Sequence, residues 1–475
     1  MIDRQTDIFI DALALVPERK SGVGYSIEQT LLCLAQLPQN SNRTIYLVVP
    51  LGKAKHLQRY VEGNVKTKTI YLPARIMELL LRLNVFPPID WLLGFGIYIF
   101  PNYRNFPVWR SRSLTYIYDV AFIKHPEMVQ PKNQKYLQHY VTRWLGRSSK
   151  IIAISNAGRT EIEKYLAVPS TNIEMVYCGV DSNIFYKRQE LEVARVKKVY
   201  GIDYDKYFLF VSTIEPRKNI LSLLDAYDAL PLKVKQTYGL VLVGGTGWLN
   251  EAVYDRLAAL QKKGLQIQKV DTYVMTEDLP AIYSGATLLI HPAYYEGFGM
   301  TPLEAMACET PVIVSDIPAI REVVRDSAVY FNPLTADSLT ESITHALINP
   351  TLLEKNVKAG RLRAQQLSWM TSAESLQQVI EGQLGQKTGR PLVSRLKYIY
   401  SVWDVRIRSF CGEKVLEAYK PSPAASRSIM RQEVHYDYLH DQPNYVQAFL
   451  LKVYLQTKHL LFKGLVGAYL MARRA

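Results

Sequence analysis

Residues 287–314 constrain the fold of this chain more than any other stretch. A β-branched and apolar run at 287–290 leads to a glycine-rich turn at 297–299, and a second apolar run occupies 312–314. Between them, Thr301 and Pro302 have the positions of a helix N-cap and first helical residue. The order strand, glycine loop, helix, strand predicts a parallel sheet wound with helices. In such a unit the loop amides and the helix N-terminus lie above the strand ends, where they suit a phosphate or sugar hydroxyls.

Two carboxylates, Glu296 and Glu304, flank this turn at a spacing of eight positions. Glu304 falls at the third position of the predicted helix, where a carboxylate can bond back to the N-cap amide of Thr301 and complete a capping box. A purely structural role is therefore an alternative to ligand binding for Glu304. Glu296 lies in the turn itself, where no local structure requires it. It is the stronger candidate for binding or catalysis.

The stretch EGFGMTPLEAMACETPVIVSD resembles the E-x7-E signature of the family-4 retaining glycosyltransferases, which have the GT-B fold. The resemblance implies that Glu296 acts near the hydroxyls of the transferred sugar as the catalytic carboxylate. It also implies that Glu304 contacts the donor ribose, and that Gly297, Phe298 and Gly299 border the donor. The segments EPRKN and HPE are most similar to the mannosyltransferases of bacterial polysaccharide assembly, including O-antigen and exopolysaccharide enzymes.

The chain has 475 residues, enough for two or three domains with their own cores. Apolar strands alternate with helices through the first domain, with strands predicted at 8–15, 44–49, 69–72, 97–100, 114–118 and 150–155. The resemblance adds a helix from Ser368 to about 383 that crosses back onto this domain. We therefore expect an α/β chain of GT-B fold, with two doubly wound Rossmann-like domains facing each other across a cleft. Their expected bounds are 1–190 on the acceptor side and 191–386 for the nucleotide-sugar, followed by a basic, mainly helical extension over 387–475.

Gly22 and Gly24 follow the first predicted strand and precede a helix predicted over 26–36. Two glycines at a strand-to-helix turn are a weak indication of a phosphate-binding loop, because any tight turn can hold glycine. The family carries a glycine loop at this place, beside the donor phosphates. The resemblance therefore implies donor binding by Gly22 and Gly24.

Arg217 and Lys218 lie between a strand predicted at 207–212 and a helix predicted at 220–230. Such a pair suits a diphosphate, since arginine offers a planar fork and lysine a compact point charge. The alternative is a solvated pair of surface cations. The family places its diphosphate-binding cations in this segment, which implies donor binding by Arg217 and Lys218.

The segment TYIYDVAF, followed by HPE, resembles a family strand end that reads IHDLAF. The resemblance implies that Asp119 is a second catalytic carboxylate at the cleft. The alternative is that Asp119 only caps a helix or stabilises a loop. Tyr118 stands where the family has a histidine, and this departure bears on any role that needs an imidazole beside the sugar. We expect His125 to be structural and Ser155 to cap the helix that follows it.

The formal net charge is +14, and the basic excess is concentrated in residues 387–475, with fifteen Lys and Arg against six Asp and Glu. The first 386 residues therefore need not bind a polyanion, and no nucleic-acid partner is expected. Four cysteines without a C-x-x-C pair argue against disulfides or a zinc site and favour a reducing compartment, the cytoplasm. The charged N-terminal segment is expected to form a first strand rather than a signal peptide.

An amphipathic helix is predicted over 445–474, with Lys452, Lys458 and Lys463 interrupting its apolar residues. Each lysine would cost roughly 2.5–3.5 kcal/mol near the centre of a bilayer, so we expect an interfacial rather than a spanning helix. This geometry predicts peripheral association with the cytoplasmic face of a membrane. The alternative is a helix packed on the protein's own body.

The resemblance implies transfer of a hexose, with retained anomeric configuration, from a nucleotide diphosphate-sugar to a glycan or lipid-linked glycan. GDP-mannose is the first expectation for the donor and a UDP-sugar the second. No Asp-x-Asp cluster occurs in the segments assigned to the cleft, so neither a metal nor another cofactor is expected. Two alternatives stay open: a sugar-nucleotide epimerase of the same fold, and a non-catalytic protein that binds membrane or nucleic acid through its basic tail.

Overall fold

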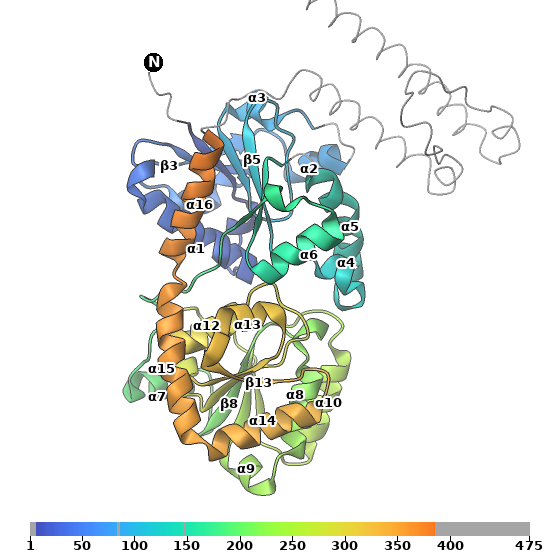
Figure 1. The fold of residues 1–475 in the computed structure, drawn as a ribbon, viewed down its shortest axis with the longest axis vertical. Coiled ribbons are helices and arrows are strands. Elements are labelled where there is room, and N and C mark those ends of the chain that lie inside the picture. The colour runs from blue at the N-terminus through green and yellow to red at the C-terminus, as the bar shows by residue number, and fades with distance from the viewer. Residues whose placement is uncertain (1–5, 83–85, 146–147, 385–475) are drawn as a thin grey trace, which may run out of the picture. The chain divides into compact units, whose positions relative to one another are not determined.

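The computed structural model describes residues 6–82, 86–145 and 148–384 (Figure 1). Its strands form two sheets, and all of the strand pairs in both sheets are parallel. Parallel neighbours need long crossover connections, and helices supply most of them here. The structure therefore confirms the predicted α/β class with two separate, helix-covered sheets.

The first sheet has seven strands in the order β3-β2-β1-β4-β5-β6-β7. The strands are β1 (Ile8–Asp11), β2 (Ile45–Pro50), β3 (Val65–Ile70), β4 (Ile97–Phe100), β5 (Arg112–Ile117), β6 (Lys150–Ala153) and β7 (Ile173–Met175). The helices between them are α1 (Gly22–Gln36), α2 (Ala74–Arg82), α3 (Ile89–Leu93), α4 (Ala121–Lys124), α5 (Pro131–Leu145) and α6 (Asn156–Leu166).

The second sheet has six strands in the order β10-β9-β8-β11-β12-β13. The strands are β8 (Tyr207–Val211), β9 (Gly239–Val243), β10 (Ile267–Val270), β11 (Leu288–His291), β12 (Val312–Ser315) and β13 (Ala328–Phe331). The helices are α7 (Glu190–Val199), α8 (Ile220–Ala229), α9 (Leu232–Thr237), α10 (Glu251–Lys262), α11 (Leu279–Gly285), α12 (Met300–Ala307), α13 (Pro318–Val324), α14 (Ala336–Ile348) and α15 (Pro350–Gln366). We keep residues 190 and 386 as proposed domain boundaries.

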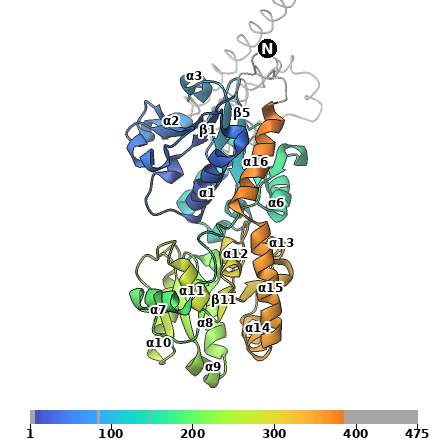
Figure 2. The ribbon, with the colours of Figure 1, turned by 90° about the vertical axis from the view of Figure 1, so that its left-hand side faces the viewer.

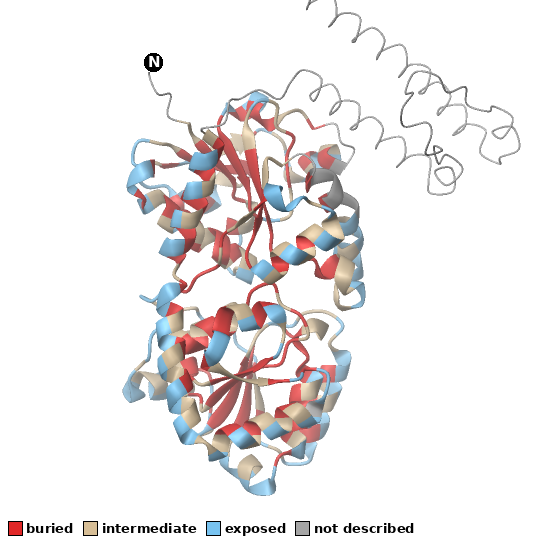
Figure 3. Cartoon of the chain, viewed as in Figure 1, coloured by how far each residue is buried: buried red, intermediate tan, exposed pale blue. Residues whose placement is uncertain are grey.

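The central strands are buried on both faces, as Figure 3 shows in red. β9 has the sequence GLVLV and is buried throughout, and β8, YFLFV, is buried at four of its five positions. Continuous apolar runs of this kind are typical of parallel strands with helices on both sides, because neither face meets water. The continuous apolar runs therefore allowed both strands to be predicted from the sequence.

Helix α16 (Trp369–Leu384) returns from the second sheet to the first and packs along α1 (Figure 2). Asn40, just after α1, donates from its Nδ2 to Gln377 Oε1 at 2.9 Å. The Trp369 ring meets the Tyr25 ring edge-on, with centroids 6.1 Å apart. The predicted crossing of the chain back onto its first domain is therefore confirmed.

The predicted loop at Gly22 and Gly24 is wrong, because both residues belong to the first turn of α1. Ser21 is the N-cap and its Oγ accepts from the Gly24 amide at 3.2 Å. The preceding strand is also shorter than predicted and ends at Asp11, since residues 13–15 form a 3-10 turn. The hydroxyl cap starts the helix four residues earlier than the apolar periodicity had indicated.

The predicted capping box at Thr301 is also wrong. Helix α12 begins at Met300, and its N-cap is Gly299, whose φ of +111° lies in the left-handed region. Glycine adopts this conformation without a steric penalty, so the N-cap lies two residues before Thr301, the predicted N-cap. Glu304 is thereby displaced from the third helical position, where a capping carboxylate would lie.

The two edge strands of the first sheet were poorly predicted. β3, with the sequence VKTKTI, begins four residues before the predicted strand because its four central residues are lysines and threonines, which mask the apolar pattern. β7 has three residues and was not predicted. A strand this short at a sheet edge leaves little periodicity to detect.

The proposed extension at 387–475 lies outside the described residues, as do the helix predicted at 445–474 and its three lysines. Within residues 6–82, 86–145 and 148–384, no helix combines the length and hydropathy needed to cross a bilayer.

Candidate active site

The loops that follow β8 and β11 bring three of the predicted site residues together. β8 and β11 are parallel neighbours in the second sheet, so their carboxyl ends open at the same edge. Arg217 and Lys218 lie on a 3-10 turn (Pro216–Lys218) after β8, and Glu296 lies after β11. The two loops are also joined through their backbones, since the Tyr294 amide donates to the Arg217 carbonyl at 2.8 Å.

Glu296 is the centre of this group, with a side chain that is 9% exposed. Its Oε1 accepts a short hydrogen bond from Lys218 Nζ and lies 3.0 Å from His291 Nε2, while its Oε2 lies 3.3 Å from Arg217 Nη1. Burial by itself would raise the pKa of Glu296, but the two cations and the His291 hydrogen bond outweigh it. They hold the pKa of Glu296 well below its usual value, so this carboxylate is ionised.

Arg217 and Lys218 are not the solvated pair considered as an alternative. Lys218 is only 7% exposed, and burial lowers its pKa despite the neighbouring Glu296. Arg217 contacts three carboxylates: it donates from Nε to Glu215, approaches Glu296, and lies 4.0 Å from Asp119 Oδ2. These carboxylates outweigh the effect of burial and raise the pKa of Arg217. Both cations are thus paired with carboxylates.

Asp119 follows β5 and therefore brings the first sheet into the same group. Its Oδ1 also accepts from the Ala121 amide at 3.1 Å, which is the local loop role considered as the alternative. The Tyr103 hydroxyl holds the backbone here, accepting from the Asp119 amide at 2.9 Å and lying 3.2 Å from the Asp119 carbonyl. The two roles coexist, because one oxygen serves the loop and the other faces Arg217.

The loop that carries Glu296 is anchored on residues of the first sheet. The Tyr295 hydroxyl accepts from the Val120 amide at 3.1 Å and donates to Glu161 Oε2 at 2.6 Å. Gly297 packs so closely that a Cβ atom there would lie 2.2 Å from the Tyr118 carbonyl oxygen. Only glycine fits that position. Tyr118, where the family has histidine, is itself buried at 7% exposure.

Phe298 and Gly299 determine the conformation of the turn, and within the described residues neither forms a hydrogen bond or ion pair with the charged side chains around Glu296. Phe298 is buried, and its ring lies 6.1 Å from that of Tyr177 in a tilted arrangement. Gly299 supplies the left-handed N-cap of α12. We therefore assign both residues a part in holding the loop, and direct donor contact by them stays a prediction.

Glu304 lies apart from the charged group, on α12. Its Oε2 accepts from the Tyr283 hydroxyl at 2.8 Å, and burial raises the pKa of Glu304 to about 7. Burial, followed by the charge of Glu304, raises the pKa of Tyr25 on α1. The Tyr25 hydroxyl is buried and has no hydrogen-bond partner within the described ranges.

Several residues of this site were not found from the sequence: His291, Glu215, Tyr283 and Tyr295. His291 ends a buried apolar strand, and a polar residue at the carboxyl end of a parallel strand is a signal that could have found it. Glu215 lies two positions before Arg217 in the sequence. Tyr283 and Tyr295 read as ordinary core aromatics, and only the fold brings their hydroxyls to carboxylates.

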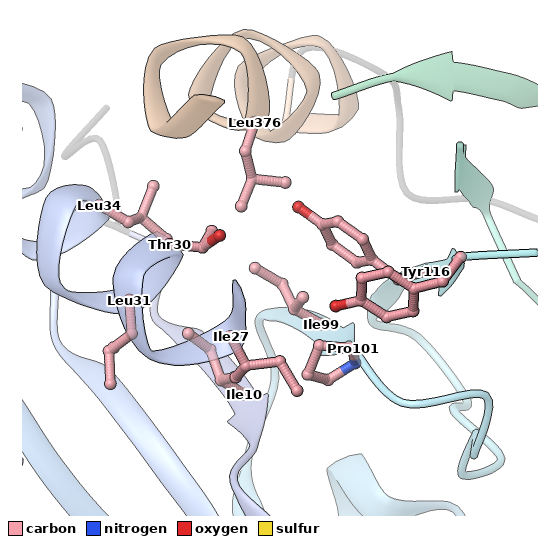
Figure 4. Close-up of a pocket in the computed structure, with 10 residues that line it drawn as sticks. Ile10, Ile27, Thr30, Leu31, Leu34, Ile99, Pro101, Tyr116 and Leu376 are labelled. Atoms are coloured by element: carbon pink, nitrogen blue, oxygen red, sulfur yellow. The ribbon is translucent and has the colours of Figure 1, made fainter. Parts of the chain in front are cut away.

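A separate apolar cavity of about 20 Å³ lies between α1, α16 and the first sheet (Figure 4). Its walls are mainly aliphatic, with Ile10, Ile27 and Leu376 among them, and Figure 4 shows the Tyr116 ring at its side. The volume suffices for about one water molecule and does not suit a nucleotide. In the part of the chain that the structure describes, no group of three or more His, Cys, Asp and Glu side chains could hold a metal ion.

Comparison with known proteins gives related sequences and folds. The profile described as "Glycosyl transferases group 1" matches residues 193–363. The O-antigen chain mannosyltransferase B of Escherichia coli is 30% identical over 273 residues, which are 58% of this chain and 71% of that protein. Sucrose-phosphate synthase from Thermosynechococcus elongatus has a TM-score of 0.61 at 19% identity, covering 80% of this chain and 99% of the other. Anabaena HepE in complex with UDP and glucose has a TM-score of 0.59 at 16% identity, covering 80% and 100%.

The structural likenesses establish the GT-B fold, which confirms the predicted fold class. The sequence match covers 58% of this chain and more than two thirds of the Escherichia coli protein. It favours glycosyl transfer over the epimerase and over a non-catalytic binding protein. The chain is a glycosyltransferase and belongs to the group 1 glycosyl transferase family.

Proposed function

We propose that this enzyme transfers a hexose from a nucleotide diphosphate-sugar to a hydroxyl of a glycan or lipid-linked glycan, with retention of anomeric configuration. Mannose from GDP-mannose is the first proposal for the donor, supported by the relative that is named a mannosyltransferase. A UDP-sugar is the second, supported by the fold of a protein that binds UDP and glucose. The proposed setting is the cytoplasmic synthesis of a cell-surface polysaccharide.

The observation that carries this proposal is the partly buried group formed by Arg217, Lys218 and Glu296 at the carboxyl ends of β8 and β11. Two neighbouring cations suit a diphosphate, and an ionised carboxylate beside them suits sugar hydroxyls. Ligands of doubly wound α/β domains bind outside the carboxyl ends of the strands. The group thus has both the chemistry and the location expected for a nucleotide-sugar.

The proposed reaction builds charge in two places. As the bond between C1 and the phosphate oxygen breaks, negative charge gathers on the leaving diphosphate and the sugar becomes oxocarbenium-like. Arg217 and Lys218 stabilise the diphosphate, while Glu296 and Asp119 orient and stabilise the sugar. The acceptor oxygen bonds to C1 on the face that the diphosphate leaves, and the acceptor proton passes to a phosphate oxygen. We assign no covalent nucleophile.

The remaining donor contacts are also proposals. Glu304 would accept hydrogen bonds from the ribose, and the first turn of α1 with Gly22 and Gly24 would border the phosphates. No metal ion is required in this scheme, because the two cations neutralise the diphosphate; activity unchanged by EDTA would support it. Peripheral membrane attachment through 445–474 predicts that the full chain co-sediments with anionic vesicles at low salt and is released at high salt.

The experiment that tests the function is calorimetric titration with GDP, UDP, GDP-mannose and UDP-glucose, combined with an assay for transfer to a lipid-linked glycan. Binding of one base, weakened by about 1.5–3 kcal/mol in Lys218→Met, is the expected result. Lys263→Met is the matched control, because Lys263 forms a solvent-exposed ion pair with Asp228 and not with Glu296. Absence of binding by all four compounds would overturn the assignment.

A further inference from the structure

His291 is a buried titratable residue to which the proposed reaction has so far given no part. It is the last residue of β11, is 1% exposed, and lies 3.0 Å through its Nε2 from Glu296 Oε1. Its Nδ1 is buried and has no hydrogen-bond partner in the described part of the chain. The ring therefore makes one polar contact, and that contact is with the central carboxylate of the site.

The geometry fixes the tautomer of this ring. An ionised carboxylate only accepts hydrogen bonds, so Nε2 must carry the hydrogen that faces Glu296. A hydrogen on Nδ1 would be a buried donor without an acceptor, which is costly. Burial, with Lys218 and Arg217 nearby, lowers the pKa of His291 although Glu296 acts in the opposite direction. His291 is thus a neutral Nε2–H donor.

The other two partners of Glu296 are cations with a second task. Under the proposed function a bound diphosphate attracts Arg217 and Lys218 and so weakens their hold on Glu296. A neutral imidazole has no net charge for the diphosphate to attract. The backbone that carries the ring is the end of β11, and the His291 carbonyl accepts from the Ser315 hydroxyl at 3.4 Å. His291 is therefore the partner of Glu296 that a bound diphosphate does not draw away.

We propose that His291 is a positioning residue, which holds Glu296 Oε1 while Arg217 and Lys218 turn toward the donor diphosphate. The proposal rests on the proposed function. Held in this way, Oε1 is occupied and Oε2 is the oxygen offered to the hydroxyls of the transferred hexose. The neutral donor fixes the carboxylate without adding positive charge where the sugar becomes oxocarbenium-like.

Two substitutions to amide residues distinguish the hydrogen bond to Glu296 from a role of His291 in packing alone. In His291→Gln the amide nitrogen occupies about the place of Nε2 and can still donate to Glu296. In His291→Asn the same amide is one bond shorter and cannot reach. We expect kcat to stay within about threefold of the wild type for H291Q and to fall roughly ten- to a hundredfold for H291N, the loss expected for a hydrogen bond to a charged group. Affinity for the bare nucleoside diphosphate should be unchanged in both.

Equal losses in H291Q and H291N, or no loss in either, would overturn the proposal while leaving the transferase function intact. A fall in nucleoside diphosphate affinity that parallels the fall in kcat would also overturn it, because it would indicate general damage to the site. A wild-type enzyme that transfers no sugar would instead remove the proposed function.

A second measurement does not depend on turnover. Nitrogen chemical shifts of 15N-histidine-labelled protein report the tautomer, and the signal missing from H291Q identifies His291. We expect a neutral ring with hydrogen on Nε2, whose shift changes in Glu296→Gln. An Nδ1–H tautomer or an imidazolium at neutral pH would contradict the assignment.

Discussion

Ser155 donates a hydrogen bond of 2.7 Å from its Oγ to the carbonyl oxygen of Gly297, a residue 142 positions further along the chain. The same Oγ accepts from the Gly158 amide at 2.9 Å, which confirms the predicted cap of α6. One hydroxyl therefore begins a helix beside the first sheet and holds the loop of Glu296, which follows a strand of the second. This link makes the position of Glu296 depend on both sheets.

Removing that hydroxyl should affect both stability and activity. Ser155→Ala loses an N-cap and a buried hydrogen bond, so we expect a loss of about 2 kcal/mol in the free energy of unfolding and a reduced kcat. Urea denaturation and the transfer assay measure the two effects. Ser368→Ala is the control, because Ser368 accepts from the Thr371 amide but does not contact Gly297. If both variants lost activity alike, the link to Gly297 would have no catalytic importance.

Adding a methyl group at Gly297 should displace the loop. In Gly297→Ala the new Cβ would meet the Tyr118 carbonyl at 2.2 Å, and the backbone has to move to relieve the contact. A shift of about 1 Å in the reacting geometry can lower the rate by about a hundredfold. Gly382→Ala is the control, since a Cβ there has no neighbour within 4 Å. An alanine variant at 297 with wild-type kcat would show that the loop tolerates the shift.

Donor binding should depend on the ionisation of Glu304. Burial raises the pKa of Glu304 to about 7, so its neutral form predominates below pH 7 and its carboxylate above. If the carboxylate accepts ribose hydroxyls, affinity for the nucleotide-sugar should rise by about tenfold between pH 6 and pH 8, in proportion to the ionised fraction. Calorimetry at both values measures it.

Glu304→Gln is the control for this pH dependence. The glutamine carbonyl can still accept from the Tyr283 hydroxyl, which bonds Glu304 at 2.8 Å, but the amide does not titrate. The pH dependence of donor affinity should disappear in this variant. A pH dependence that persists would have to come from another group.

The buried ion pair of Lys218 and Glu296 allows stability to be separated from donor binding. Lys218→Met leaves Glu296 with fewer compensating charges in a buried position, so we expect a loss of about 1.5–3 kcal/mol in unfolding free energy. Adding Glu296→Gln removes the uncompensated charge and should restore much of the stability, because Arg217 retains Glu215 and Asp119 as partners.

Donor affinity should respond differently in the same double variant. Stability returns when the carboxylate is neutralised, but the cation proposed to bind the diphosphate is still missing, so affinity should stay low. Urea denaturation and calorimetry on the single and double variants complete the cycle. Recovery of donor affinity together with stability would show that Lys218 acts on the fold rather than on the ligand.

The sequence by itself determined the strand–helix order, because short continuous apolar runs such as GLVLV and YFLFV are typical of interior parallel strands. It also marked Glu296 in the glycine turn as a candidate site residue, and the family resemblance added the two cations before α8. Where local chemistry competed with periodicity, as at the Ser21 cap and the Gly299 cap, the sequence prediction placed the helix starts wrongly.

Only the tertiary structure decided which of these residues act together. It joins Glu296 to Lys218, 78 positions earlier, and adds His291 as a third partner, while Glu304 pairs with Tyr283 elsewhere. The side chains meet because β8 and β11 are neighbours in a sheet whose order differs from the order of the chain. Ionisation follows from the same cause: burial raises the pKa of one glutamate, and two cations lower that of the other.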